Sequence, residues 1–392
     1  MKKIPLKQKA TQRVLKGYPL LVKEDFVQPL NEKEGSLVEL TDEQNHFVAT
    51  AYLAEQNKGA GWVLSLNPNE VITESFYERL FMQAADIREH LKADETTTAY
   101  RFFNGEGDGL GGLTIDAYED YYVFSWYSQG IYEHQKSILR AFENTVTDAK
   151  GIYQKFRYKR SDDIVSEFVS GTPAPEPLII QENGVKYAVY LDDGLMTGIF
   201  LDQRHVRRSL MENYSAGRSV LNTFSYTGAF SVAAALGGAV ETVSVDLAKR
   251  SLPKTEEQFA VNGLYTDQHK IRVMDVFDYF KYAVRKNLLF DTVVVDPPSF
   301  ARSKKRTFSV AKNYTALLED VIDITQSGGT IIASTNSAAV SATRFETFIR
   351  EAFENKGLRY RIMETHTLPE DFHVNPNFKE GNYLKVYIVQ KG

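Results

Sequence analysis

Short apolar runs alternate with polar turns and helical segments between residues 219 and 300. Four of these runs, at 219–224, 242–245, 270–274 and 292–295, have the length of buried strands. The segment 229–236, made mostly of small residues, follows the first run and is predicted to be a helix. Buried strands that alternate with helices are typical of a parallel α/β sheet. We therefore expect such a sheet in the C-terminal half of the chain.

Each predicted strand ends in polar or turn-forming residues. The turn Ser225-Tyr226-Thr227-Gly228 follows the first run, and the other runs end on Asp246, Asp275 and Asp296. In parallel α/β sheets, ligands bind beyond the carboxyl ends of the strands. The sequence therefore predicts a binding site at this edge of the sheet.

The spacing of Gly228 and Asp246 indicates which class of ligand binds there. A glycine turn followed by an acid about 20 residues later holds a nucleoside, with the acid on the ribose hydroxyls. The complete G-x-G-x-x-G pattern, which lets the backbone approach a pyrophosphate, is missing. This favours a nucleoside without a pyrophosphate, such as S-adenosylmethionine. The alternative is an ordinary α/β turn with a surface aspartate.

The segment Asp296-Pro297-Pro298-Ser299-Phe300 strengthens this interpretation. Its two prolines fix φ and remove two backbone donors, so the strand exit is stiff and its carbonyls remain free to accept hydrogen bonds. Phe300 is placed to stack on a planar ring. The segment resembles the class I S-adenosylmethionine-dependent methyltransferases, whose fourth strand ends in Asp/Asn-Pro-Pro-aromatic when the target is a base or an amide. The alternative is a proline-rich loop beside an unrelated strand.

The N-terminal half is predicted to form two smaller domains. Residues 1–70 contain short strand patterns at 37–40, 47–52 and 61–66 and resemble a PUA domain, a small RNA-binding β-barrel. A generic barrel used for packing is the alternative. Residues 71–174 form a separate α+β unit, with helices expected at 75–91 and 131–146 and a strand at 121–127.

Two loops punctuate this half of the chain. Residues 101–116 contain five glycines, but they lack the Lys-Ser/Thr of a P-loop, and their acids would repel phosphate. We therefore expect a tight multi-turn loop between strands. A proline-rich linker at 172–177 separates the central unit from the domain 175–392, which opens with a hairpin around Asn183-Gly184.

Composition excludes several classes of protein. With 43% hydrophobic and 25% charged residues, the 392-residue chain is ordinary for a globular protein, and no apolar run reaches the ~18 residues of a membrane span. The basic N-terminus lacks the apolar segment of a secretion signal, so we expect a cytoplasmic protein without a membrane partner. The absence of cysteine excludes disulfides, thiolate metal sites and cysteine nucleophiles. We expect no metal.

The formal net charge of −5 argues against a general polyanion binder, but basic residues are clustered. Residues 1–23 carry seven cations and no acid. The cluster at 155–160 is interpreted as a solvated face. A third cluster, Arg302, Lys304, Lys305 and Arg306, follows the Asp-Pro-Pro segment directly. We expect this third cluster to contact RNA phosphates, because it lies beside the predicted site.

Taken together, the chain resembles the RlmI/RlmK-like family of 23S rRNA methyltransferases. The matching motifs lie at 101–110, 197–204, 222–228, 296–300 and 380–385. The resemblance implies an N-terminal PUA-like β-barrel, a small central α+β domain and a Rossmann-like class I methyltransferase sheet. It also implies S-adenosylmethionine as the methyl donor and structured rRNA as the substrate. A homodimer is compatible with the sequence.

The resemblance also implies roles for individual residues. Phe224 to Gly228 would contact the methionine part of the donor, Asp246 the ribose, and Asp275 with Val276 the adenine. Asp296 would face the sulfonium and the target base. The implied cofactor-binding residues are Gln203, Arg204, Phe224, Tyr226, Thr227, Gly228, Asp246, Asp275, Val276 and Asp296. The implied catalytic residues are Asp296, Pro297, Pro298, Phe300 and Asn336.

One departure from the RlmI type decides the expected chemistry. Enzymes that make 5-methylcytosine need a cysteine after the fifth strand, because a thiolate must add to carbon 6 before carbon 5 can attack. Here that position is Asn336, as in RlmK-like enzymes, which methylate a guanine ring nitrogen. We therefore expect direct transfer to a base nitrogen. The alternatives are a catalytically weak assembly factor that binds S-adenosylmethionine and RNA, and a methyltransferase for proteins or small molecules.

Overall fold

The computed structural model describes residues 1–392 except 58, 266 and 303–306. The chain folds into two compact units, each assembled from separate stretches of sequence. Unit 1 comprises Met1–Ile180, Val189–Thr197 and Glu370–Gly381, and unit 2 comprises Gln181–Ala188, Gly198–Pro369 and Asn382–Gly392. The predicted boundaries 1–70, 71–174 and 175–392 remain a prediction. None of the described helices is both long and apolar enough to cross a membrane.

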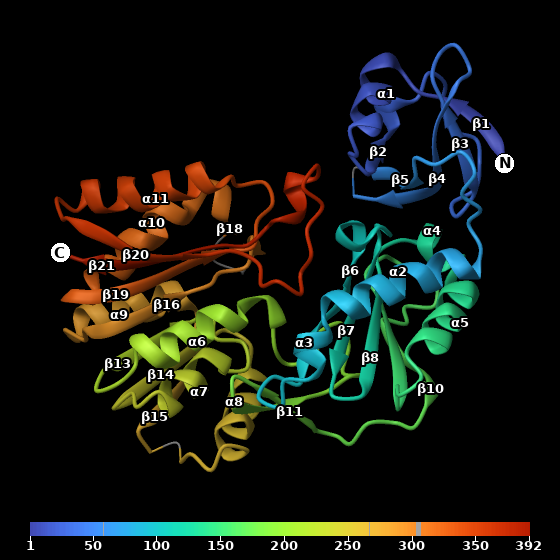
Figure 1. The fold of residues 1–392 in the computed structure, drawn as a ribbon. Helices are drawn as coiled ribbons and strands as arrows, with labels where there is room; N and C mark the ends of the chain where they lie inside the picture. Colours follow the sequence, from blue (N-terminus) through green and yellow to red (C-terminus); the bar gives the residue numbers. More distant parts are fainter. Residues whose placement is uncertain (58, 266, 303–306) are drawn as a thin grey trace. The chain divides into compact units, whose positions relative to one another are not determined.

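Unit 2 is built on a seven-stranded sheet (Figure 1). In spatial order its strands are β15 (His269–Val273), β14 (Glu241–Asp246), β13 (Ser219–Thr223), β16 (Phe290–Val295), β19 (Thr325–Thr335), β21 (Lys385–Lys391) and β20 (Tyr360–His366). The first five strands run parallel, and β21 is antiparallel to both of its neighbours. The strand order reverses direction between β13 and β16, which is where open sheets of this kind bind ligands. The four strands predicted between 219 and 295 are confirmed.

Both faces of this sheet are covered by helices, because alternate side chains of each strand point to opposite faces. Leu221, Val293 and Ile331 pack on one face against α9 (Val276–Arg285), α10 (Val310–Asp323) and α11 (Ala342–Asn355). Val220, Val294 and Ile332 pack on the other against α6 (Arg204–Asn213) and α7 (Ala229–Leu236). On that second face Phe259 of α8 (Ser251–Ala260) stacks on His269 of β15. Burial on both sides explains the continuous apolar runs of the sequence.

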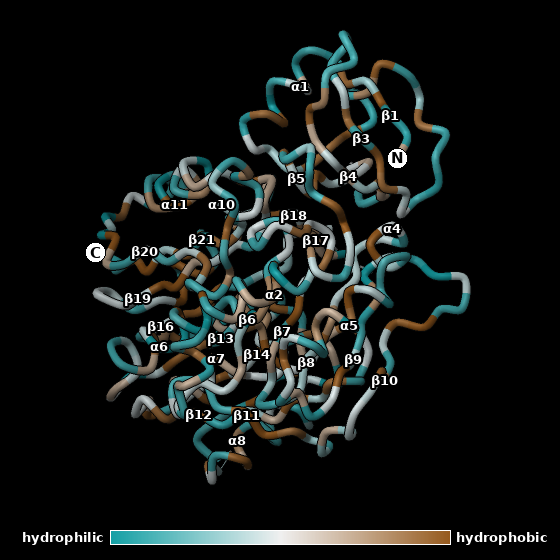
Figure 2. Tube along the Cα trace, turned by 45° about the vertical axis from the view of Figure 1, so that its right-hand side comes forward, coloured by the Kyte–Doolittle hydropathy of each residue, from teal (hydrophilic) through white to brown (hydrophobic). Residues whose placement is uncertain are grey.

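Unit 1 contains two five-stranded sheets. The first has the order β1 (Lys2–Pro5), β3 (Leu37–Thr41), β4 (Phe47–Gln56), β5 (Gly59–Ser65) and β2 (Leu20–Val22), with α1 (Gln8–Leu15) packed on it. The second has the order β10 (Ser166–Gly171), β9 (Gly151–Phe156), β8 (Tyr121–Trp126), β7 (Leu113–Tyr118) and β6 (Ala99–Asn104). In Figure 2 hydrophobic residues concentrate along strands and hydrophilic ones along connecting loops. The strands predicted at 37–40, 47–52, 61–66 and 121–127 are confirmed.

The two long helices predicted in this region are each interrupted. The first breaks at Arg88, between α2 (Glu74–Ile87) and α3 (Glu89–Lys92), because the buried Arg88 guanidinium bonds to Asp108 at 2.7 Å and to the carbonyl of Asp371 at 2.6 Å. The second breaks at His134, between α4 (Gln129–Tyr132) and α5 (Gln135–Thr145). His134 Nε2 lies 2.8 Å from the carbonyl of Gly35. Tertiary contacts of one side chain therefore override helix propensity at both sites.

The glycine-rich loop between β6 and β7 is the predicted multi-turn loop. Gly107 faces the backbone of His373 so closely that a Cβ on it would lie 1.7 Å from the His373 carbonyl oxygen. His373 Nδ1 also lies 3.2 Å from Asp108 Oδ1, and this contact raises the pKa of His373. The loop therefore serves packing, since it receives the segment Glu370–Gly381 from the far end of the chain.

The predicted hairpin at Asn183-Gly184 is confirmed. It joins β11 (Leu178–Glu182) to β12 (Val185–Val189), and both turn residues have positive φ, 52° and 78°. Two positive φ values are the mark of a type I′ turn.

Candidate functional site

The loop after β13 has an unusual backbone. Phe224, Tyr226 and Gly228 all have positive φ, at 53°, 52° and 81°. Bulky residues avoid this region, and such strain persists only where the surroundings impose it, often at functional sites. Here the loop reverses direction within five residues and delivers the chain into α7, which begins at Ala229.

Asp246 holds this loop in place from the end of β14. Its Oδ2 accepts a hydrogen bond from the Tyr226 N–H at 2.9 Å, and its Oδ1 accepts one from the Ala248 N–H at 2.8 Å. A carboxylate has about four acceptor positions, so each oxygen can take a further donor. Asp246 is therefore able to order the loop and bind hydroxyl groups at the same time.

Asp275 follows β15 and caps the helix that comes next. Its Oδ1 accepts from the N–H groups of Phe277 and Asp278 at 3.0 and 3.3 Å. No described residue donates to its Oδ2, which leaves one acceptor of this carboxylate for a ligand. The side chain of Val276 is only 4% exposed and belongs to the core of unit 2.

A small cavity of about 60 Å³ lies at the switch point between β13 and β16. It brings together five of the predicted residues: Gln203, Phe224, Tyr226, Thr227 and Asp296. Ser225, which lies inside the predicted loop from Phe224 to Gly228, also lines it. The lining residues that sequence reasoning missed are Ile199, Phe200, Arg207, Asn222, Ala229 and Phe230. Ile199 and Phe200 stand inside the 197–204 motif, which was the signal for these two. Arg207 lies one helical turn beyond Gln203, so helical spacing was the signal for its position.

Asp296 and Gln203 form the polar centre of this cavity. Gln203 Nε2 donates to Asp296 Oδ2 at 3.1 Å and to Ser334 Oγ at 2.9 Å. Burial raises the pKa of Asp296 to about 6. The hydrogen bonds from Ser334 and Gln203 and the charge of Arg207 lower this pKa and so offset part of the effect of burial. A carboxyl group with this pKa is mostly ionised at neutral pH but titrates within reach of it.

The other end of the Gln203 amide has no partner. Gln203 is 3% exposed, and its Oε1 forms no hydrogen bond within the described chain. The opposite orientation of the amide would point Oε1 at the Asp296 carboxylate, so the hydrogen bonds fix the amide as it stands. A buried acceptor left unpaired costs about 1–3 kcal/mol. The cavity therefore fits a ligand that brings a hydrogen-bond donor, as the ammonium group of S-adenosylmethionine would.

The two arginines of α6 differ in position. Arg204 is buried but does not line the cavity. Arg207 lines it and pairs through two hydrogen bonds, of 2.6 and 2.8 Å, with the buried Glu182. A buried bidentate pair of this kind is strongly oriented. Arg207 therefore ties α6 to the β11–β12 hairpin while it borders the cavity.

The Asp-Pro-Pro segment presents an aromatic ring next to Asn336. Pro297 is buried and Pro298 exposed, and Phe300, which opens the hairpin of β17 (Phe300–Arg302) and β18 (Thr307–Ser309), is 62% exposed. Ser299 Oγ donates to Asn336 Oδ1 at 2.7 Å. This contact uses the amide oxygen of Asn336. In the part of the chain that the structure describes, its NH₂ group makes no hydrogen bond.

The basic clusters fare differently. Lys304, Lys305 and Arg306 lie outside the described residues. In the N-terminal stretch, ion pairs join Lys2 to Glu32, Lys3 to Glu39, Arg13 to Asp25 and Lys23 to Glu55. These acids come from beyond residue 23, so the stretch is less cationic in the fold than in the sequence.

The expectation that the 155–160 cluster is a solvated face is wrong for Lys155. This residue is 1% exposed, donates to the carbonyl of Gly194, and has its pKa lowered by burial to about 8. It lies in β9, whose six residues are all buried. Arg160 lies over the Phe156 ring, 3.9 Å from its centre. Packing of these aliphatic and planar groups explains the positions of Lys155 and Arg160, whereas Lys159 is exposed as expected.

Comparison with known proteins identifies the domain types. A model of S-adenosylmethionine-dependent methyltransferases matches residues 103–378, and a model of PUA-like domains matches residues 4–66. The chain is 51% identical to Bacillus subtilis YwbD, and the match covers the whole of both proteins. YwbD is provisionally named a ribosomal RNA large subunit methyltransferase. It is 29% identical to the Aeromonas salmonicida protein named ribosomal RNA large subunit methyltransferase I, over 92% of this chain and 91% of that one.

A solved structure agrees over the whole length. SMU.776, described provisionally as a methyltransferase and crystallised with SAH, superposes with a TM-score of 0.94 at 42% identity, over 100% of both chains.

Proposed function

We propose that this chain, which belongs to the family of S-adenosylmethionine-dependent methyltransferases, methylates a base nitrogen of large-subunit ribosomal RNA. The family supplies the donor, S-adenosylmethionine. The names of the relatives, YwbD and methyltransferase I, support the RNA substrate. The N-terminal PUA-like match supports it as well, since such domains bind RNA.

The donor site that we propose is the cavity at the switch point and its surroundings. When bound, the cofactor supplies an electrophilic methyl group. The loop from Phe224 to Gly228 would enclose its methionine part, and Asp246 would accept from its ribose hydroxyls while it holds the Tyr226 N–H. Asp275, through its Oδ2, and Val276 would border the adenine. Arg204 would act from behind this site, because it does not line the cavity.

Gln203 would bind the donor's ammonium group through its unpaired Oε1. This assignment follows from the chemistry of the cavity, because Gln203 lines it and Oε1 is a buried acceptor without a partner in the described chain. An unpaired carbonyl oxygen of this kind suits a cation with N–H donors. Arg207 does not compete for this position, because Glu182 neutralises it.

The target base would lie against Asp296, Phe300 and Asn336. Phe300 is exposed and can stack on the base, while the backbone carbonyls of the Asp-Pro-Pro segment and the Asp296 carboxylate accept from its N–H groups. The NH₂ of Asn336 can donate to a base acceptor. Asp296 can also take a proton if the methylated nitrogen carries one, since its pKa of about 6 makes it a weak base near neutral pH.

The observation that carries the choice of nitrogen is Asn336, in a chain without cysteine. Attack by a nitrogen lone pair needs an in-line approach and nearby charge stabilisation but no covalent intermediate. The test is mass spectrometry of rRNA nucleosides from a deletion strain and its parent. We expect a nucleoside methylated on nitrogen to be missing from the deletion strain. Loss of 5-methylcytidine instead would contradict the proposal.

RNA would be held by residues 1–70 and by the cluster Lys304, Lys305 and Arg306. Within the first of these, Lys9 and Lys16 are exposed and form no ion pair in the described structure. We therefore expect these two lysines to contribute more to phosphate contact than the paired Lys2, Lys3, Arg13 and Lys23. The homodimer remains a prediction.

A further inference from the structure

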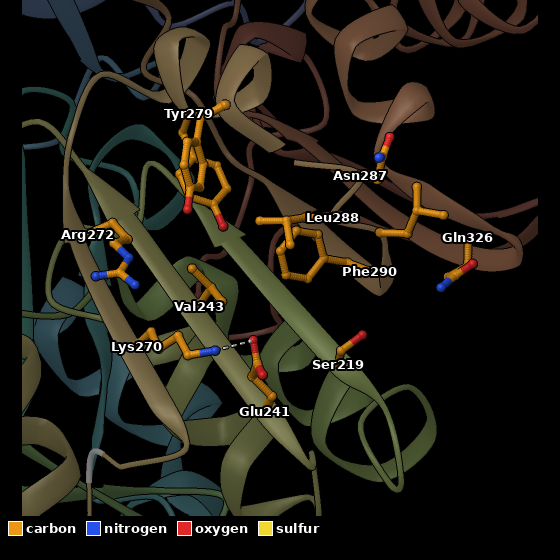
Figure 3. A pocket seen from close by; sticks show the side chains of 12 residues that line it. Ser219, Glu241, Val243, Lys270, Arg272, Tyr279, Asn287, Leu288, Phe290 and Gln326 are labelled. Atoms are coloured by element: carbon orange, nitrogen blue, oxygen red, sulfur yellow. Dashed lines mark ion pairs between the residues drawn. The ribbon is translucent and has the colours of Figure 1, made fainter. Parts of the chain in front are cut away.

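A second cavity, of about 470 Å³, opens at the opposite edge of the unit 2 sheet, where the strands begin (Figure 3). It is lined by Ser219, Glu241, Val243, Lys270, Arg272, Tyr279, Tyr282, Asn287, Leu288, Leu289, Phe290 and Gln326. None of the residues assigned to the donor or the target base borders it. Cavities of this size hold small organic ligands or parts of larger ones.

The cavity exists because α9 covers only part of its face of the sheet. Lys270 pairs in register with Val243, and Arg272 with Val245, so these side chains share the face that α9 covers farther along the strands. At the amino ends of β14 and β15 the face is open. Its floor is apolar, formed by Val243, Leu288 and Phe290.

The polar groups around this floor are arranged in three sets. Figure 3 shows Lys270 and Arg272 along one side, and Asn287 and Gln326 on the other. Tyr279 and Tyr282 of α9 form a third wall, with ring centres 5.9 Å apart. These groups match the parts of a nucleotide. Cations bind its phosphate, aromatic rings and an apolar floor bind the face of its base, and amides bind the edge of its base.

Arg272 is the cation available for a phosphate. Lys270 Nζ lies 3.1 Å from Glu241 Oε1, so its charge is balanced. Arg272 is exposed and forms no ion pair or hydrogen bond among the described residues. One guanidinium group can donate to two oxygens of a phosphate at once, so Arg272 is the expected point of contact.

We propose that this cavity binds one unstacked nucleotide of the RNA substrate, with its phosphate on Arg272 and its base between the tyrosine pair and the apolar floor. The proposal rests on the proposed RNA methyltransferase function. A five-residue strand such as β13 spans about 17 Å, so the cavity and the donor site are separated by little more than one strand length. A structured RNA can reach both edges of the sheet at once.

The test compares Arg272→Gln with Arg361→Gln, a matched exposed arginine on β20, the strand at the other edge of the sheet. Binding of a 23S rRNA transcript is measured over a series of salt concentrations, with SAH affinity as the control for folding. For Arg272→Gln we expect the slope of log K against log salt to fall by about 0.7–0.9, the value for one phosphate contact. For Arg361→Gln we expect the slope of the parent protein. Equal slopes for the two variants would overturn the proposal.

A second variant tests the base. We expect Tyr282→Ala to weaken RNA binding by roughly 5- to 150-fold, the range for loss of one stacked base. Ultraviolet crosslinking of the parent protein to the transcript should attach a nucleotide to the peptide that contains Tyr279 and Tyr282. Absence of both effects would contradict the assignment.

Binding of free nucleotides is measured as well, to distinguish a site for a free nucleotide from a site for a nucleotide of RNA. If nucleoside 5′-monophosphates bind the parent protein but not Arg272→Gln, while RNA binding is unchanged, the cavity serves free nucleotides and the RNA proposal is wrong. Methyl transfer to rRNA is assayed on the same preparations. A parent protein that methylates rRNA with no change of slope in Arg272→Gln refutes the cavity proposal alone, whereas a parent protein that neither binds nor methylates rRNA refutes the proposed function.

Discussion

Gln203 Nε2 lies 3.1 Å from Asp296 Oδ2 and donates to it, although the two residues are 93 positions apart in the sequence. The bond joins the start of α6 to the end of β16 across the point where the strand order reverses. Because the same nitrogen also donates to Ser334, the amide is fixed, and its buried oxygen has no partner in the described chain. Much of the proposed chemistry depends on this arrangement.

Replacing Gln203 by methionine should abolish discrimination between SAH and its analogue without the α-amino group. The parent protein should prefer SAH, because only SAH donates to Gln203 Oε1. Gln203→Met should bind the two ligands equally, with its affinity for the analogue unchanged. Titration calorimetry measures both affinities, and the analogue shows that the variant is folded. A preference for SAH that is the same in both proteins would place the ammonium group elsewhere.

Asp246→Ala should weaken binding of S-adenosylmethionine for two reasons. The ribose hydroxyls lose an ionised acceptor worth on the order of 1.5–3 kcal/mol per hydrogen bond, and the Tyr226 N–H loses the carboxylate that orders the loop. Asp246→Asn should also bind weakly, because an amide presents only one oxygen where two N–H groups now donate. Calorimetry measures the affinity of the parent protein and of both variants for S-adenosylmethionine. Equal affinities would show that the ribose is bound by other residues.

The pH dependence of methylation should report on Asp296. Below its pKa of about 6 this group is protonated and can no longer accept a proton or act as an anion, so kcat/KM should rise with pH through about 6 and then level off. Gln203→Met should move the rise to higher pH, because the hydrogen bond from Gln203 lowers the pKa of Asp296. A profile that is flat between pH 5 and 8, an interval of about one unit or more on each side of this pKa, would exclude a role for its ionised form.

Asn336→Ala should lower turnover but leave donor binding intact, since Asn336 contacts Ser299 and is not part of the donor cavity. Ser299→Ala is the matched variant, because it removes the group that positions the amide. It should show a smaller loss in the same direction. RNA that carries 5-fluorocytosine should form no covalent adduct with any of the three proteins, because no thiolate is present. Equal turnover in all three would assign Asn336 a purely structural role.

The sequence was sufficient to predict the first four strands of the unit 2 sheet, β13 to β16, and the residues that end them. The side chains of β13, β14 and β16 are buried on both faces, so their apolar runs are nearly continuous, and each polar residue that ends a run marks the edge of the sheet. The turn after β13 and the hairpin at Asn183-Gly184 were also predictable, because each depends on a local signal, a glycine in a turn. Positive φ at a glycine is recognisable from sequence alone.

Contacts between distant parts of the chain were not predictable. The helix break at Arg88 depends on Asp108 and Asp371. The burial of Lys155 depends on the carbonyl of Gly194. The role of Arg207 at the cavity depends on Glu182, which no helical pattern reveals. In each case a long polar side chain is buried because its partner comes from another segment, and local sequence carries no record of that partner.

The identity of the methylated product tests the central claim most directly. Purified protein is incubated with rRNA from a deletion strain and with S-adenosylmethionine that carries a deuterated methyl group, and the digested nucleosides are resolved by mass spectrometry with fragmentation. We predict that the label appears in one nucleoside, on a nitrogen of its base, and that Asp296→Ala abolishes the signal. A label on carbon 5 of cytidine would contradict the account, because that reaction needs a nucleophile that this chain does not contain.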